Sequence, residues 1–253
     1  NLAWQHALLL AATGQQQEAL KAARALLQSN PGRNDLREGF LDLLDSLDQT
    51  QEAVAQAQAL AAQNPQDKEL LIRLATLQQR GNNLQGAVTT LENYVTVAGA
   101  TETDLLRVAR ILESWEKPPA KADSPASKAY RRLVEAFPDS SSAKEVYAHY
   151  LHREGRRDEA LALWQTLAQS GTLEDLLRIA QALQARLESR PALDVLLGRE
   201  REFGGQPRYL ALLVQTAVAN EEYERALPWA LTRLGLMRSG EDIENALVPL
   251  RLI

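Results

Sequence analysis

The sequence predicts an all-α protein, a solenoid of antiparallel helix pairs. An alanine recurs at a fixed spacing, since Ala19, Ala53 and Ala87 lie 34 residues apart, each after a turn rich in Gln, Glu or Gly. An Asn-Pro pair recurs with the same period, ending at Pro31 and Pro65. A constant period near 34 residues is typical of helical repeats, in which each unit packs on its neighbours.

Each repeat reads as helix, short turn, helix and stop. The first repeat has two apolar-periodic runs, at about residues 2–12 and 17–28. Apolar residues of the second run fall on one helical face, namely Ala19, Leu20, Ala23, Leu26 and Leu27. Gly14 lies between the runs, where a tight turn needs a residue that tolerates positive φ, and Pro31 stops the second run.

These residues resemble the tetratricopeptide repeat, a 34-residue helical hairpin with alanine at its twentieth position, a small residue at its eighth and glycine at its turn. The twentieth-position alanines are Ala19, Ala53, Ala87, Ala126, Ala160, Ala192 and Ala226. The eighth-position small residues are Ala7, Ala75, Ala109, Ala148 and Ala180, whereas Leu41 and Val214 depart from the pattern. Gly14 and Gly155 keep the turn glycine, which Asp48 and Asn82 replace. The resemblance implies a right-handed superhelix whose first helices line a concave groove.

The repeats follow one another without a break. Their predicted ranges are 1–33, 34–66, 67–99, 100–138, 139–171, 172–205 and 206–238, followed by a final helix over 239–253 that Ser239 to Asp242 would cap. We expect the chain to be a segment of a longer array. The fourth repeat carries an insertion over 116–125 with paired prolines, which would form a surface loop or a docking element. Ser142 to Glu145 fits a capping box that opens the helix after it.

Composition and motifs exclude several function classes. The formal charge of the 253 residues is −5, which argues against a general nucleic-acid binder. Cysteine is absent, so disulfides and thiolate metal sites are excluded. No apolar run approaches the ~18 residues of a membrane span. No phosphate loop, dinucleotide fingerprint or nucleophile elbow occurs, so we expect neither enzyme activity nor a cofactor. His149 and His152 alone make an incomplete metal site, and we expect packed histidines there rather than a metal.

Charged residues on the first helices are the candidate binding site. At the family positions that face the groove, the acidic residues are Asp35, Glu38 and Asp42, the basic ones are Arg73, Arg107, Arg110 and Arg178, and His149 lies beside Glu145. The groove would therefore run from acidic to basic, and its arginines would bind an acidic protein surface through forked contacts with carboxylates. The alternative is a solvated face in which Asp42 and Arg73 pair between adjacent hairpins.

The function implied by the resemblance is a non-enzymatic protein-binding scaffold. The cysteine-free style, rich in Ala, Gln, Leu and Arg, is similar to long bacterial arrays in the periplasmic parts of exopolysaccharide export machineries of the Pel, cellulose, alginate and poly-N-acetylglucosamine types. Such arrays recruit polymer-modifying enzymes, so we expect a protein partner of that kind, no nucleic acid, and a membrane only through parts of the chain not present here. A cytoplasmic assembly adaptor is the first alternative. Direct polysaccharide binding is the second; it favours exposed aromatic residues along the groove, where only Trp4 occurs.

Overall fold

The computed structural model describes residues 2–236, and this part of the chain is all-α, with helices in antiparallel pairs and no strand. The first helices of the pairs are α1 (Leu2–Ala12), α3 (Asn34–Ser46), α5 (Lys68–Arg80), α7 (Glu102–Trp115), α9 (Ser141–Arg153), α11 (Leu173–Gln184) and α14 (Pro207–Ala219). The second helices are α2 (Gln16–Ser29), α4 (Thr50–Gln63), α6 (Leu84–Ala98), α8 (Pro125–Ala136), α10 (Arg157–Ser170), α12 (Ser189–Leu197) and α15 (Tyr223–Leu236). A short helix, α13 (Glu200–Phe203), follows α12. The predicted all-α solenoid of helix pairs is confirmed. The predicted helix over 239–253 lies outside the described residues.

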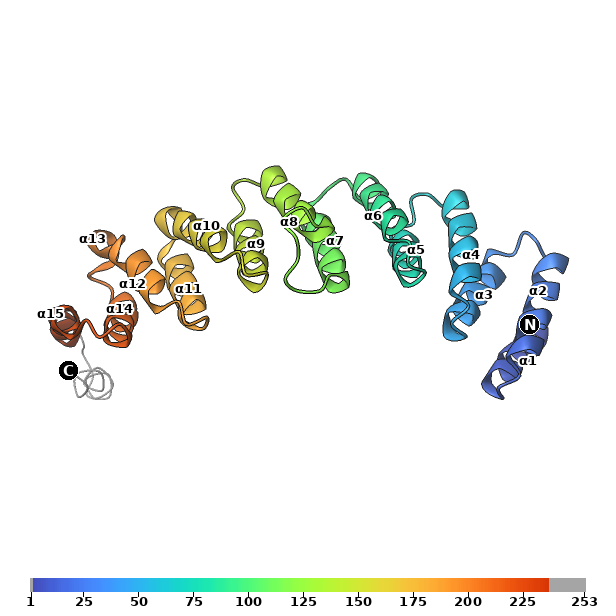
Figure 1. The fold of residues 1–253 in the computed structure, drawn as a ribbon, viewed down its shortest axis with the longest axis horizontal. Coiled ribbons are helices and arrows are strands. Elements are labelled where there is room, and N and C mark those ends of the chain that lie inside the picture. The colour runs from blue at the N-terminus through green and yellow to red at the C-terminus, as the bar shows by residue number, and fades with distance from the viewer. Residues whose placement is uncertain (1, 237–253) are drawn as a thin grey trace. The chain divides into compact units, whose positions relative to one another are not determined.

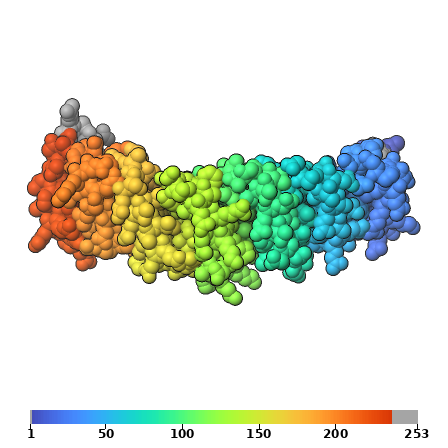
Figure 2. All heavy atoms as spheres, turned by 90° about the horizontal axis from the view of Figure 1, so that it is seen from above, coloured from blue at the N-terminus to red at the C-terminus, as the bar shows by residue number. Residues whose placement is uncertain are grey.

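The chain divides into two compact units, which we describe separately. Unit 1 comprises Asn1–Lys117 and Lys121–Leu133, and unit 2 comprises Pro118–Ala120 and Val134–Ile253. Within each unit the two helices of a hairpin run side by side (Figure 1), and the hairpins form successive bands of surface in chain order (Figure 2). Each hairpin therefore packs mainly on its neighbours in sequence, as expected of a repeat array.

Small residues occupy the places where helices approach one another most closely. The seven alanines in phase at the twentieth position are all 0% exposed: Ala19, Ala53, Ala87, Ala126, Ala160, Ala192 and Ala226. The eighth-position alanines are also 0% exposed: Ala7, Ala75, Ala109, Ala148 and Ala180. Leu41 and Val214, which depart from the small-residue pattern, are likewise buried. The predicted phase of the repeat is confirmed.

The helix–helix turns share a left-handed backbone residue. Gly14 has φ +81° and Gly155 has φ +77°, while Asp48 and Asn82 at the equivalent place have φ 54° and 60°. Asn and Asp tolerate this conformation better than other non-glycine residues. The turn geometry thus persists where the glycine is lost, because the substitutes are residues that adopt it at low cost.

The insertion in the fourth hairpin is tied to the fold by hydrogen bonds. The linker between α7 and α8 covers residues 116–124, whereas three residues join the helices of most other hairpins. The Glu116 carboxylate accepts hydrogen bonds from the Ser124 hydroxyl, at 3.0 Å, and the Ala126 N–H, at 2.9 Å, and so satisfies a donor at the start of α8. The Ala120 N–H donates to the carboxylate of Glu154. These bonds fix the linker to the hairpins around it.

The start of α9 differs from the predicted one. The capping residue is Ser140, whose hydroxyl accepts from the Ala143 N–H at 3.1 Å, so the capping box predicted at Ser142 was wrong. Ser140 wins because the helix already begins at Ser141, two residues after Asp139, and places Ser142 inside its first turn.

Two tryptophans show why the aromatic residues belong to the packing. Trp164 is 0% exposed, and the rings of His149 and His152 lie 5.4 and 5.7 Å from its ring. Trp4 of α1 lies against Gly39 of α3, where an added Cβ would come within 2.7 Å of the indole. Gly39 is thus needed for close approach of α1 and α3. In the described part of the chain no helix is long and apolar enough to cross a membrane.

Candidate functional site

Most of the predicted groove arginines pair with carboxylates of the preceding hairpin. In unit 1, Arg73 of α5 contacts Asp42 of α3 at 2.6 Å, and Arg107 of α7 contacts Glu69 of α5 at 2.8 Å. In unit 2, Arg178 of α11 pairs with Glu145 of α9, and Arg208 of α14 pairs with Glu174 of α11 at 2.7 Å. The alternative predicted for Asp42 and Arg73 is therefore what the structure shows. Exposed pairs of this kind stabilise a fold by only ~0–1 kcal/mol each, but they neutralise the arginines that form them.

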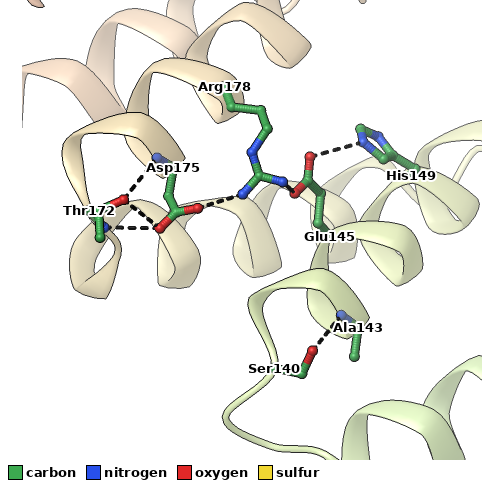
Figure 3. A network of polar contacts seen from close by, with 7 residues as sticks. All are labelled: Ser140, Ala143, Glu145, His149, Thr172, Asp175 and Arg178. Carbon is green, nitrogen blue, oxygen red and sulfur yellow. Dashed lines mark hydrogen bonds and ion pairs between the residues drawn. The ribbon is translucent and has the colours of Figure 1, made fainter. Parts of the chain in front are cut away.

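Arg178 lies at the centre of a polar network in unit 2 (Figure 3). Its guanidinium donates to Asp175 at 2.6 Å and to Glu145, and Glu145 is also 3.6 Å from Nε2 of His149. Asp175 accepts further bonds from the Thr172 hydroxyl and N–H, which hold the pKa of its carboxyl below the usual value. Arg178 and His149 are thereby brought together, and both are engaged within the fold.

The acidic residues predicted for the groove do not gather into one cluster. Asp42 pairs with Arg73, and Asp35 accepts a hydrogen bond from Arg33 at 2.7 Å just before α3. Glu38 is exposed and has no hydrogen bond or ion pair with any residue that the structure describes. The acidic half of the groove is therefore a solvated helix face with local ion pairs.

The outer face of α7 has a different character. Six residues of this helix border a hollow of about 430 Å³: Thr103, Leu106, Arg107, Arg110, Ile111 and Ser114. We call this surface the α7 outer face. Its members are spaced as one side of a helix requires, while Leu105, Val108, Ala109 and Leu112 on the opposite side are buried. The hydroxyl of Thr101 fixes the start of α7, because it accepts from the Asp104 N–H at 3.2 Å.

Arg107 is held in place before any partner arrives. Its guanidinium makes two parallel hydrogen bonds to Glu69, both 2.8 Å long, and lies 5.9 Å from the centre of the Tyr94 ring. These bonds hold the pKa of the Glu69 carboxyl below its usual value. Tyr94 is fixed in turn because its hydroxyl donates to Asp104 at 2.6 Å. The result is an ordered cationic edge on the hollow, with its charge already compensated.

Arg110 is the uncompensated cation of this face. It is exposed, one helical turn from Arg107, and no residue that the structure describes pairs with it. Leu106 and Ile111 are half-buried beside it, so apolar surface borders the free guanidinium. A surface that combines partly exposed aliphatic side chains with an arginine is suited to a protein segment that has apolar and acidic residues.

Unit 2 has a hollow of about 510 Å³ on its own first helices, but its charges are compensated. Arg178 and Arg208 line it, from α11 and α14, and both are in the ion pairs described above. The polar residues Gln181 and Gln215 line much of the remainder. Among the described residues, the α7 outer face thus offers the stronger binding surface.

Sequence reasoning placed Arg107 and Arg110 on this face but missed what surrounds them. Glu69 and Tyr94 come from the preceding hairpin, and nothing in their spacing marks them as partners of Arg107. Leu106 and Ile111 were detectable, because they follow the helical period of the two arginines. Within the described residues no group of His, Asp or Glu is arranged to hold a metal ion.

Comparisons with known proteins add little to this description. A scan against protein-family models and a search of curated proteins found no match. Among solved structures, the chain is similar to one described as Naa15/Naa10 bound to HypK-THB, with 16% identity, TM-score 0.46 and coverage of 98% of this chain but 38% of that one. It is also similar to a tetratricopeptide repeat protein from Parabacteroides merdae ATCC 43184, with 14% identity, TM-score 0.41 and coverage of 99% of this chain and all of that one. The fold assignment above rests on the hairpins themselves.

Proposed function

We propose that the chain is a non-enzymatic scaffold, and that the α7 outer face of unit 1 binds an acidic, partly apolar segment of a partner protein. The observation that carries the proposal is Arg110, an exposed guanidinium that pairs with no described residue and lies beside half-buried Leu106 and Ile111. The other predicted groove arginines contribute less, because carboxylates of the preceding hairpin already occupy their donors.

Arginine and aliphatic side chains act together at such a surface. A partner carboxylate would receive two parallel hydrogen bonds from Arg110, and a neighbouring apolar side chain would fill the hollow over Leu106 and Ile111. Arg107 would keep its shape during binding, since Glu69 and Tyr94 hold it. Little side-chain entropy would then be lost at that position, which favours affinity.

We further propose that this scaffold acts in the bacterial periplasm, in exopolysaccharide export, and that its partner is a polymer-modifying enzyme. The support is the cysteine-free composition and the resemblance of style to export arrays. Direct polysaccharide binding is disfavoured, because Trp4, the aromatic residue nearest the groove positions, packs against Gly39. Cell fractionation of an epitope-tagged chain expressed from its own gene tests the compartment: release with the periplasmic contents supports the proposal, and retention in the cytosol would contradict it.

The binding site is tested by comparing two charge reversals. The test variant is Arg110→Glu, and its matched control is Lys21→Glu on α2, since Lys21 is also exposed and pairs with no described residue. Wild type and both variants are immobilised and exposed to extract of the source cells, and the retained proteins are compared by quantitative mass spectrometry. We expect a retained protein that the control keeps and that Arg110→Glu reduces at least about tenfold, equivalent to ~1.4 kcal/mol.

The outcome that removes the α7 outer face from the account is equally clear. If Arg110→Glu and Lys21→Glu retain the same proteins in the same amounts, Arg110 is not part of a binding site. Raising the salt concentration gives a second check, because an interaction steered by Arg110 weakens with ionic strength.

A further inference from the structure

The second hollow of unit 1 lies on the other side of α7. It has a volume of about 500 Å³ and lies between α6 and α8, with α7 beneath. We call it the α6–α8 trough, and its lining residues are Leu84, Gln85, Val88, Leu91, Glu92 and Val95 from α6, Leu105, Val108 and Leu112 from α7, and Pro125, Lys128, Ala129 and Arg132 from α8. No residue of the α7 outer face lines it, so the trough is a separate surface.

The trough is a consequence of the insertion. Three residues join α5 to α6, whereas nine residues, 116–124, join α7 to α8, and Glu116 anchors the start of α8. The longer linker gives α8 a different placement from the second helix of a regular hairpin, and apolar side chains of α6 stay uncovered. Leu84 is 46% exposed and Val88 is half-buried, although both are aliphatic.

The walls of the trough differ in charge. Lys128 and Arg132 lie one turn apart on α8, both exposed, and neither pairs with a residue that the structure describes. Glu92 and Gln85 border the opposite wall, on α6. The trough therefore has an apolar floor, one cationic wall and one polar to acidic wall.

We infer that the α6–α8 trough binds an amphipathic α-helix of a partner protein, with an apolar stripe in the trough and carboxylates along the side that faces Lys128 and Arg132. The dimensions suit a helix: the lining of α6 runs from Leu84 to Val95, about 16 Å at a rise of 1.5 Å per residue, which equals roughly three turns. A hollow flanked by two helices is filled well by a third, whose apolar residues at i, i+3, i+4 and i+7 enter it. The charge of the α8 wall selects an acidic helix and fixes its direction of approach.

This inference does not depend on the proposed function of the α7 outer face. The two surfaces share α7 but no residue, so a partner could occupy either alone or both together. Occupation of both would link two weak contacts on one scaffold and raise the overall affinity.

The experiment uses the full chain and a defined probe. The probe is a stapled, fluorescein-labelled helical peptide of about 14 residues, long enough to be helical, with leucines at i, i+3, i+4 and i+7 and glutamates along one flank. A second peptide carries lysines in place of the glutamates. Fluorescence anisotropy is measured for wild type, for Arg132→Glu, and for the matched control Arg131→Glu, whose neighbouring arginine is exposed on the same helix but does not line the trough.

We expect the acidic peptide to bind wild type and Arg131→Glu equally, and Arg132→Glu to weaken it at least about tenfold. The lysine peptide should bind wild type at least about tenfold more weakly than the acidic one. Val88→Trp, which fills the trough from α6, should abolish binding while circular dichroism shows an unchanged helix content. Equal loss in Arg131→Glu and Arg132→Glu, or no binding of the acidic peptide to wild type, would overturn the inference.

Other occupants give distinguishable results. If dodecanoate binds and the acidic peptide does not compete with it, the trough is a site for small amphiphiles and the helix assignment is wrong. If sedimentation shows a dimer that Val88→Trp dissociates, the occupant is a second copy of the chain, and the assignment to a partner helix is also wrong.

Discussion

Replacing Ala53 with leucine tests the packing on which the array depends. Ala53 is 0% exposed and lies in α4, which packs between α3 and α5 in unit 1. Leucine adds three carbon atoms where no space is left, so α4 has to move away from a neighbour or adopt a strained rotamer. Overpacking of this kind costs ~1–3 kcal/mol. Ala55→Leu is the matched control, since Ala55 is on the same helix but exposed.

The expected shift follows from the size of unit 1, which is between 100 and 150 residues. For such a body each kcal/mol lowers Tm by roughly 3–5 °C, so Ala53→Leu should lower the first thermal transition by roughly 3–15 °C. The control should stay within about 0.5 kcal/mol of wild type, as expected of a surface change. Differential scanning calorimetry measures both. If Ala53→Leu melts with the control, the close contact at the twentieth position is not a determinant of stability and the packing argument fails.

Three further predictions concern turns, charge and the core. Gly155→Ala should destabilise the chain by ~1–2 kcal/mol in urea unfolding, because φ is +77° there and no atom lies within 4 Å of an added Cβ, so the cost is in the backbone; Gly155→Asn should lose less, and equal losses would refute the backbone explanation. Hydrogen bonds from Arg157 and His152 lower the pKa of Glu188 below its model value of 4.5, so its stabilisation is present above that pH and is lost as the pH falls through the folded-state pKa; Glu188→Gln should show a flatter loss of stability in urea titrations between pH 5 and 3, and an unchanged slope would contradict this. Trp164→Ala should remove ~3–5 kcal/mol from unit 2 and leave the unfolding of unit 1 unchanged, measured by hydrogen exchange; equal loss of protection in both units would show that they do not unfold separately.

The architecture was predictable because each repeat states it again. A small side chain is required wherever two helices touch, so Ala19 and its equivalents recur at a fixed period, and the structure buries every one of the seven. The turn is required in the same place, and Asp48 and Asn82 could be recognised as substitutes for glycine since they tolerate positive φ. Local physics and the global fold agree in this chain, which is what makes repeat sequences readable.

The state of the charged groups could not be predicted from the sequence. Arg73, Arg107 and Arg110 look alike in a helical pattern, yet Arg73 and Arg107 meet carboxylates of the preceding hairpin and Arg110 does not. Whether Glu69 reaches Arg107 depends on the rotation between two hairpins, and a period of 34 residues carries no information about a few degrees of rotation. The α6–α8 trough was hidden for a related reason. The insertion at 116–125 was visible, but how far it displaces α8 depends on contacts such as those of Glu116.

The difference between a paired and an unpaired arginine is the most direct test of the account. Arg73→Ala and Arg110→Ala remove the same guanidinium from neighbouring first helices of unit 1, and both variants are measured for thermal stability and, by isothermal titration calorimetry, for affinity to the protein that the α7 outer face retains. We predict that Arg73→Ala lowers stability slightly, by ~0–1 kcal/mol as for an exposed ion pair, and leaves the affinity unchanged. We predict that Arg110→Ala leaves stability unchanged and weakens binding several-fold. If Arg73→Ala weakens binding as much as Arg110→Ala does, ion pairing between hairpins does not decide which arginines bind, and the α7 outer face loses its special role.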